Sequence, residues 1–205
     1  MRPLLLILLL FALAGCRTGS GIEAVGLAPT ESGGLAAVEA RFPIAIYDSP
    51  SPGTAEIYLT DLPLEAFDAG FPASQIRGQL VQITLFVTPN PTQTPISDNA
   101  TNAVIRHAIF AGDGERELVG IYEGAGFVLP SGDPGKNRFR GDMNGGSTVL
   151  LFATEGFPDL LGATSTSLWF DAKLDPPRCT LLRRRLNTAR AESVQLQREE
   201  GDPFR

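Results

Sequence analysis

The chain has 205 residues and a formal net charge of −6 at pH 7, with 17 Lys and Arg against 23 Asp and Glu. It lacks the concentrated basic character of a nucleic-acid-binding domain, so we expect no nucleic-acid partner. One histidine and two cysteines exclude zinc sites built from several histidines, and the length suits one domain with tails.

The N-terminal segment combines a positive charge with a short apolar run. Arg2 precedes residues 4–13, which are about 10 apolar residues, whereas a membrane-spanning helix needs roughly 20. A run of this length predicts the core of a signal peptide. It ends in three residues of decreasing size followed by a cysteine, Leu13, Ala14, Gly15 and Cys16.

This tetrapeptide resembles the lipobox of bacterial lipoproteins. The resemblance implies cleavage between Gly15 and Cys16, removal of residues 1–15, and a diacylglyceryl group on the Cys16 thiol, since a thiolate is the better nucleophile. Two or three acyl chains would anchor the protein without a spanning helix. The alternatives are an ordinary signal peptide with an accidental cysteine, or an anchor that is never cut.

Residues 16–40 are rich in Gly, Ala, Ser and Thr and show weak periodicity. We predict that they form the lipidated cysteine and a flexible tether. Some 24 flexible residues reach roughly 25–30 Å, which is enough to lift a small domain clear of lipid headgroups. The alternative is that the last part, AAVEARF, forms a first strand or a short helix of the domain.

Residues 41–175 read as short strands, and we predict an all-β fold, a single antiparallel β-sandwich or barrel-like domain. In GQLVQITLFVTP, Val81, Ile83 and Leu85 alternate with polar residues, as in a half-buried strand. Gly112-Asp113-Gly114 separates AVIRHAIFAG from ELVGIYEGAGFVLP, which predicts a hairpin because Asp-Gly adopts positive φ cheaply. Further strands are predicted in AEIYLTDL, STVLLFAT and ATSTSLWFDAKL.

The intervening segments TPNPTQTPISDNATN, LPSGDPGKNRFRGDMNGGS and TEGFPDLLG are predicted to be turns, with one short helical turn each in LPLEAFDAGF and FPDLLG. Residues 176–205 are predicted to be an Arg-rich C-terminal extension. A helix is expected there from about 180 to 198, although its first part also fits a last strand. The body is weakly similar to uncharacterised lipoproteins of high-GC bacteria, through VTPNPTQTPI, TNAVIRHAIF and GIYEGAGFVLPSG, which implies a β-rich domain and no functional residue.

Two residues are candidates for a ligand site or for chemistry. His107 is the only histidine, and its phase with Ile105 predicts an inward, hydrogen-bonded structural role, although any Ser-His or Cys-His arrangement would need it. Glu123 lies in the predicted strand GIYEGAGF, where an exposed side chain is the default and a buried carboxylate would mark a site. No nucleophile elbow, phosphate loop or metal-protease motif occurs in the sequence.

Metal and cofactor sites are not expected. The glycine-rich segment around Asp133, Asn137, Asp142 and Asn144 offers oxygen donors for calcium, but it lacks the spacing of a calcium loop and includes basic residues. Cys179 has no disulfide partner once Cys16 is lipidated, and we expect it to be buried.

These features predict a lipid-anchored protein of the cell envelope, a non-enzymatic binding or structural module with an envelope protein or a glycan as partner. Arg17 follows the cysteine in place of an Asp, which permits the outer membrane, facing the periplasm, in a Gram-negative cell. The alternative is an envelope hydrolase that uses carboxylates with His107. A pocket shared by His107 and Glu123 would favour the enzyme.

Overall fold

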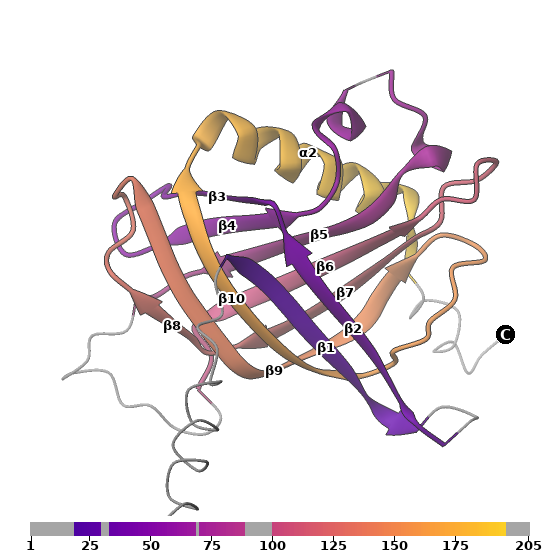
Figure 1. The fold of residues 1–205 in the computed structure, drawn as a ribbon, viewed down its shortest axis with the longest axis horizontal. Helices are drawn as coiled ribbons and strands as arrows, with labels where there is room; N and C mark the ends of the chain where they lie inside the picture. Colours follow the sequence, from indigo (N-terminus) through magenta and orange to yellow (C-terminus); the bar gives the residue numbers. More distant parts are fainter. Residues whose placement is uncertain (1–18, 30–32, 69, 89–99, 196–205) are drawn as a thin grey trace, which may run out of the picture.

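The computed structural model describes residues 19–29, 33–68, 70–88 and 100–195, and it confirms the all-β prediction (Figure 1). One α-helix, α2 (Pro176–Glu192), and two 3₁₀ turns, η1 (Leu64–Phe67) and η2 (Ala73–Gln75), accompany the strands. The strands are β1 (Ser20–Pro29), β2 (Leu35–Phe42), β3 (Ile44–Asp48), β4 (Ala55–Thr60), β5 (Arg77–Leu85), β6 (Ala103–Ala111), β7 (Val119–Gly126), β8 (Val128–Ser131), β9 (Arg138–Ala153), β10 (Thr164–Leu174) and β11 (Val194–Gln195).

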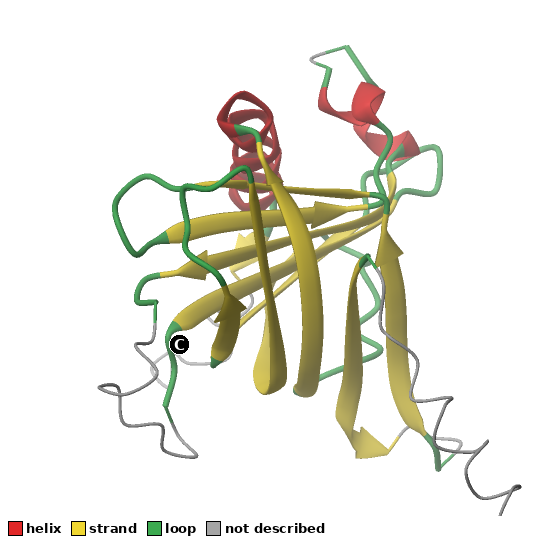
Figure 2. Ribbon diagram, turned by 60° about the vertical axis from the view of Figure 1, so that its left-hand side comes forward, coloured by secondary structure: helices red, strands yellow, loops and turns green. Residues whose placement is uncertain are grey.

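The strands form one sheet that closes on itself. Hydrogen bonding runs from β3 through β4, β5, β6 and β7 to β9, and β9 also pairs with β10. The end of β10 then pairs with β3 through Lys173 and Leu174, in the only parallel pairing among the described strands. Figure 2 shows the strands curving around a common interior, with α2 outside the sheet. The barrel-like form of the prediction is therefore the one that the structure adopts.

The predicted tether is wrong over most of its length, because β1 and β2 form a hairpin on the edge of β10. Ile22 and Ala24 of β1 are buried, and Ser20 accepts a hydrogen bond from the backbone N–H of Asp171 at 3.0 Å. A Cβ atom at Gly21 would lie 2.4 Å from the Trp169 ring. The small residues that looked like a flexible linker thus allow close packing, and the alternative strand in AAVEARF is correct.

The first half of β9 also replaces a predicted turn. Residues 138–147 pair with β8 on one side and β10 on the other, although they are rich in glycine and charge. At Gly141 a Cβ atom would lie 2.7 Å from the Phe170 ring. The glycine permits this close approach, so its presence did not mark a turn here.

Side chains fill the interior of the closed sheet. Every one of the strands from β1 to β6 and from β8 to β10 contributes to this core, and the rings of Tyr47 and Phe170 lie 5.5 and 5.6 Å from the ring of Phe139. The fully buried members with large side chains include Ile22, Tyr47, Ile57, Leu59, Ile83, Leu85, Ile105 and Phe139.

Helix α2 covers a second core on the outer face of the sheet. It begins at Pro176 and not near 180, because prolines fit the first helical turn and the Asp175 side chain accepts the N–H of Arg178 at 3.3 Å. Cys179, Leu182, Leu186 and Ala189 face the sheet and are buried. Residues 176–192 are therefore part of the domain and not an extension of it.

Two smaller predictions are also decided by the structure. Cys179 is buried as expected, and burial raises the pKa of its thiol to about 12. The helical turn in LPLEAFDAGF is present as η1, whereas FPDLLG forms no helix.

Candidate functional site

His107 lies in the middle of β6 and points into the interior of the closed sheet. It is paired with Val81 of β5 and Tyr122 of β7, and it is 1% exposed. Its Nε2 atom lies 2.7 Å from Oε1 of Gln79. Burial lowers the pKa of the imidazole to about 4, so the ring is neutral at neutral pH and donates to the amide oxygen.

The loop of residues 154–163 closes the interior beside His107. The Tyr122 hydroxyl donates to Oδ1 of Asp159 at 2.7 Å, and the same oxygen accepts the backbone N–H groups of Gly162 at 2.9 Å and Leu161 at 3.3 Å. Burial and the neighbouring carboxylate raise the pKa of Tyr122. The histidine therefore lies among hydrogen-bonded polar groups in the interior and is almost fully buried.

Glu123 belongs to a row of polar side chains on the outer face of the sheet. Tyr58, Gln82, Arg106 and Glu123 occupy directly opposed positions on β4, β5, β6 and β7. Arg106 donates to Glu123 at 3.0 Å and to the amide oxygen of Gln82 at 3.2 Å, and Gln82 donates to the Tyr58 hydroxyl at 2.9 Å. We call these four residues the polar row.

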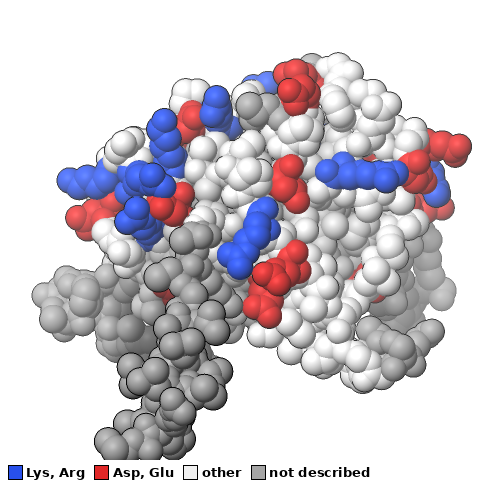
Figure 3. Space-filling view, viewed as in Figure 1, with Lys and Arg blue, Asp and Glu red and all other residues white. Residues whose placement is uncertain are grey.

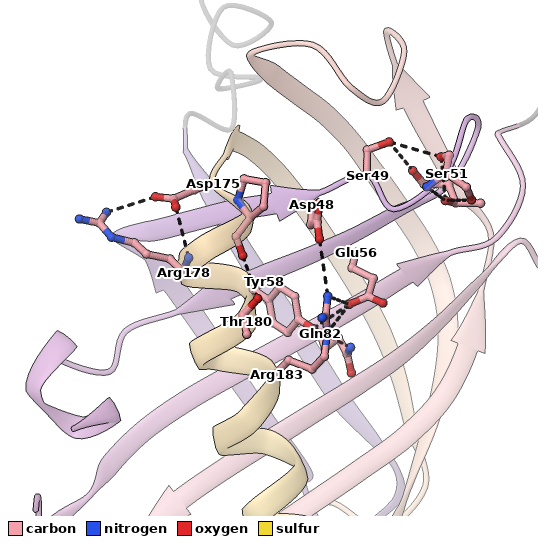
Figure 4. Close-up of polar contacts among 12 residues, drawn as sticks. Asp48, Ser49, Ser51, Glu56, Tyr58, Gln82, Asp175, Arg178, Thr180 and Arg183 are labelled. Atoms are coloured by element: carbon pink, nitrogen blue, oxygen red, sulfur yellow. Dashed lines mark hydrogen bonds and ion pairs between the residues drawn. The ribbon is translucent and has the colours of Figure 1, made fainter. Parts of the chain in front are cut away.

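Helix α2 supplies an arginine to each end of the polar row. At one end, Arg183 donates to Glu56 at 2.7 Å and lies 3.7 Å from Asp48 (Figure 4). Glu56 in turn accepts the Tyr58 hydroxyl at 2.9 Å, and burial with this carboxylate raises the pKa of Tyr58. At the other end, Arg190 lies 3.6 Å from Glu123.

A third arginine fixes the other flank of the helix. Arg185 pairs with Glu117, and its guanidinium lies 5.1 Å from the centre of the Phe110 ring. Burial raises the pKa of Glu117, with Arg185 acting in the opposite direction. The three consecutive arginines of α2 are thus divided, since Arg183 and Arg185 contact the rest of the domain and Arg184 is exposed.

His107 and Glu123 do not share a pocket. His107 is paired with Tyr122, and the side chain of the next residue on β7 leaves the sheet on the opposite face. Glu123 contacts Arg106 and Arg190 there, while His107 contacts Gln79 inside. The geometry that would favour a hydrolase is therefore not the one observed.

Three surface hollows stand out among the described residues, and none is lined by His107 or Glu123; the third lies on α2 alone, around Arg183 and Asn187. The first, which we call the β1 hollow, lies at the start of β1 and is lined by residues that include Gly19, Ser131, Arg140, Asp142, Trp169 and Asp171. The second is a groove between α2 and the segment that contains η1 and η2, lined by residues that include Phe67, Phe71, Ile76, Leu181, Arg184 and Thr188.

The segment considered for calcium has a different role in the structure. Asp142 and Asn144 lie on strand β9, and Arg138 and Arg140 of that strand both pair with Asp171, at 2.7 and 3.1 Å. Within the described ranges, no three His, Cys, Asp or Glu side chains are grouped so that they could hold a metal ion.

The predicted lipid attachment residue Cys16 and its neighbour Gly15 lie outside the described residues. The described ranges contain no helix that is both long enough and apolar enough to cross a membrane. Comparison with models of protein families, with curated proteins and with solved structures finds no match for this chain.

The polar row is not evident from the sequence. Tyr58, Gln82 and Glu123 each occupy the polar phase of a predicted strand, and arginines recur on the predicted helix. The polar residues themselves can therefore be recognised from the sequence. Their alignment depends on the register of four strands, which one sequence does not specify when polar and apolar residues share a face.

Proposed function

We propose that the protein is a lipid-anchored module of the cell envelope, without catalytic activity, that binds an envelope protein or a glycan through its surface. The observation that carries the anchor is the position of Cys16, at the end of an apolar run and four residues before the first strand of a folded domain. In a Gram-negative cell, Arg17 after the cysteine permits placement in the outer membrane, facing the periplasm.

The arrangement of the two candidate residues supports a binding or structural module over a hydrolase. Hydrolysis needs a titratable group within hydrogen-bond reach of a bound substrate. His107 is enclosed in the interior, and Glu123 is paired with two arginines on the other face of the sheet. Surface loops and the surface hollows are then the parts that remain for recognition.

Replacement of the cysteine tests the anchor. Cells that express the full chain are grown with labelled palmitate, and the protein is recovered and its N-terminus identified by mass spectrometry. We expect the wild-type protein to carry label and to begin at Cys16. The Cys16→Ser variant should carry no label and retain residues 1–15, because a hydroxyl cannot replace the thiol nucleophile.

Cys179→Ser is the matched control, because it removes the chain's other thiol from a buried position on α2. It should be labelled and processed like the wild-type protein. A Cys16→Ser protein that is still cut and labelled would contradict the lipid anchor.

A further inference from the structure

The structure leaves very little chain between the proposed lipid and the folded domain. Ser20 is the first residue of β1, is 3% exposed, and is fixed by its contact with Asp171. Cys16 precedes it by four residues, which span at most about 14 Å even when fully extended. The domain therefore cannot be lifted clear of the membrane as a long tether would allow.

The short connection also determines which part of the domain lies next to the lipid. Gly19 lines the β1 hollow together with Arg140 and Asp171. The hairpin between β6 and β7 lies at the far right of Figure 1, away from the start of β1. If the chain is anchored at Cys16, the β1 hollow and the strands around it are the parts within reach of the headgroups.

Basic side chains gather on this part of the surface. Arg138 is paired with Lys173 across β9 and β10, and Arg140 is paired with Asp171. Asp171 accepts from both arginines, whose side chains are 58% and 59% exposed, while its own is 24% exposed. One recessed carboxylate is thus covered by two projecting guanidinium groups.

The two lysines of the chain complete this surface. Lys136 lies in the turn between β8 and β9, and Lys173 lies on β10. Among the described residues neither has an acidic partner within salt-bridge distance. We call Lys136, Arg138, Arg140 and Lys173 the basic surface.

The basic surface contrasts with the rest of the chain. Figure 3 shows Lys and Arg gathered at the left of the molecule, where the β8–β9 turn and the end of β10 lie in Figure 1. The acidic residues on the same segments are Asp133, Asp142, Asp171 and Asp175, and Asp175 is paired with Arg178 at the start of α2. Five basic residues thus accompany four acidic ones, a net charge of +1 for this area, whereas the whole chain has a net charge of −6. Guanidinium and ammonium groups are good donors to phosphate.

We propose that the lipidated protein rests on its membrane with the start of β1 toward the lipid and the basic surface against headgroup phosphates. This inference rests on the proposed lipid anchor at Cys16. The partner is the lipid surface itself, and the loops on the far side of the domain are left free for other contacts.

Fluorescence quenching in vesicles tests the orientation. The full-length, lipidated protein is prepared in a Cys179→Ala background, so that one introduced thiol takes a fluorophore, either in Ser131→Cys beside the β1 hollow or in Glu115→Cys on the β6–β7 hairpin. The proteins are reconstituted into vesicles of phosphatidylethanolamine and phosphatidylglycerol that contain a headgroup-labelled quencher. We expect severalfold stronger quenching at position 131 than at position 115.

Two variants of the Ser131→Cys protein separate tether length from charge. An insertion of about 20 Gly and Ser residues after Arg17 adds a reach of roughly 25 Å and should reduce the quenching. Lys136→Glu with Lys173→Glu should also reduce it, whereas Arg116→Glu with Arg184→Glu, which changes the charge equally but elsewhere, should not.

Equal quenching at positions 131 and 115, or quenching at 131 that is indifferent to both the insertion and the lysine substitutions, would overturn the inference. Failure of the proposed anchor would be recognised separately. In that case no palmitate would be found on the protein, and it would not remain with the vesicles.

Discussion

The interior of the closed sheet and the interface beneath α2 are stabilised in different ways. The interior is filled by apolar side chains around the rings of Tyr47, Phe139 and Phe170. Under the helix, a buried apolar line is flanked by arginines that lie within salt-bridge distance of carboxylates on β4 and β7. Burial stabilises any apolar side chain of suitable shape, whereas an ion pair forms only where the register brings its two residues together. The comparison indicates that the interior gives the domain most of its stability and that the charges specify where the helix lies.

The largest effect is expected from a cavity in the interior. Phe139 is fully buried between two other rings, so Phe139→Ala should reduce the free energy of unfolding by about 3–5 kcal/mol. Urea unfolding followed by circular dichroism measures this loss. Phe86→Ala is the matched control, because Phe86 is 46% exposed and should contribute little. Similar losses for both variants would contradict the assignment of the core.

A pH-dependent effect of intermediate size is expected from His107. Its pKa is about 4 in the folded protein and 6.5 in the unfolded chain, so the unfolded state binds more protons between these values. Stability should therefore be unaffected by this group above pH 6.5 and fall by about 3 kcal/mol as the pH drops to 4. Unfolding of the wild-type protein and of His107→Gln at a series of pH values isolates this contribution. A parallel pH dependence in both proteins would show that the imidazole is not desolvated.

The smallest of the three effects concerns the polar row. Arg106→Met leaves the Glu123 carboxylate, 13% exposed, with only the more distant Arg190, and should cost about 1–3 kcal/mol. Adding Glu123→Leu should recover most of that loss, because the uncompensated charge is removed. A double-mutant cycle measured by urea unfolding gives the coupling.

Arg138→Met serves as the comparison for this cycle, since it removes a largely exposed pair with Asp171 that should contribute at most about 1 kcal/mol. If Arg106→Met and Arg138→Met reduced the free energy of unfolding equally, the ion pairs under the helix would stabilise the fold no more than those on the surface.

Sequence periodicity was sufficient to locate the strands in which apolar and polar residues alternate clearly. Strands β5, β6, β7 and β10 lie where they were predicted, although β5 is buried on both faces because its outer face belongs to the core beneath α2. Asp113 closes the expected hairpin by accepting the N–H groups of Glu115 and Arg116. Periodicity failed in β1 and in the first half of β9, because residues rich in glycine favour a tether in the first segment and a turn in the second when only the sequence is known. In both segments the missing side chains make room for aromatic rings on β10, and that reason is visible only when the partner strand is known.

The candidate residues illustrate the same limit. The inward position of His107 followed from its phase with Ile105, which depends on one strand alone. The partners of Glu123 did not follow, because Arg106 comes from a neighbouring strand and Arg190 from a helix that was expected to begin later. Single-strand properties can be read from local pattern, whereas cross-strand pairs require the register.

Strand β10 pairs with β1 over its first half and with β3 at its end, and both partners come much earlier in the chain. During synthesis β1 emerges almost 140 residues before β10, the strand with which it pairs. Contacts so far apart in the chain slow folding, because a large loop has to close first. Strand β1 can pair early with β2, the next strand along the chain, but its other edge has no partner until nearly all of the rest has been made.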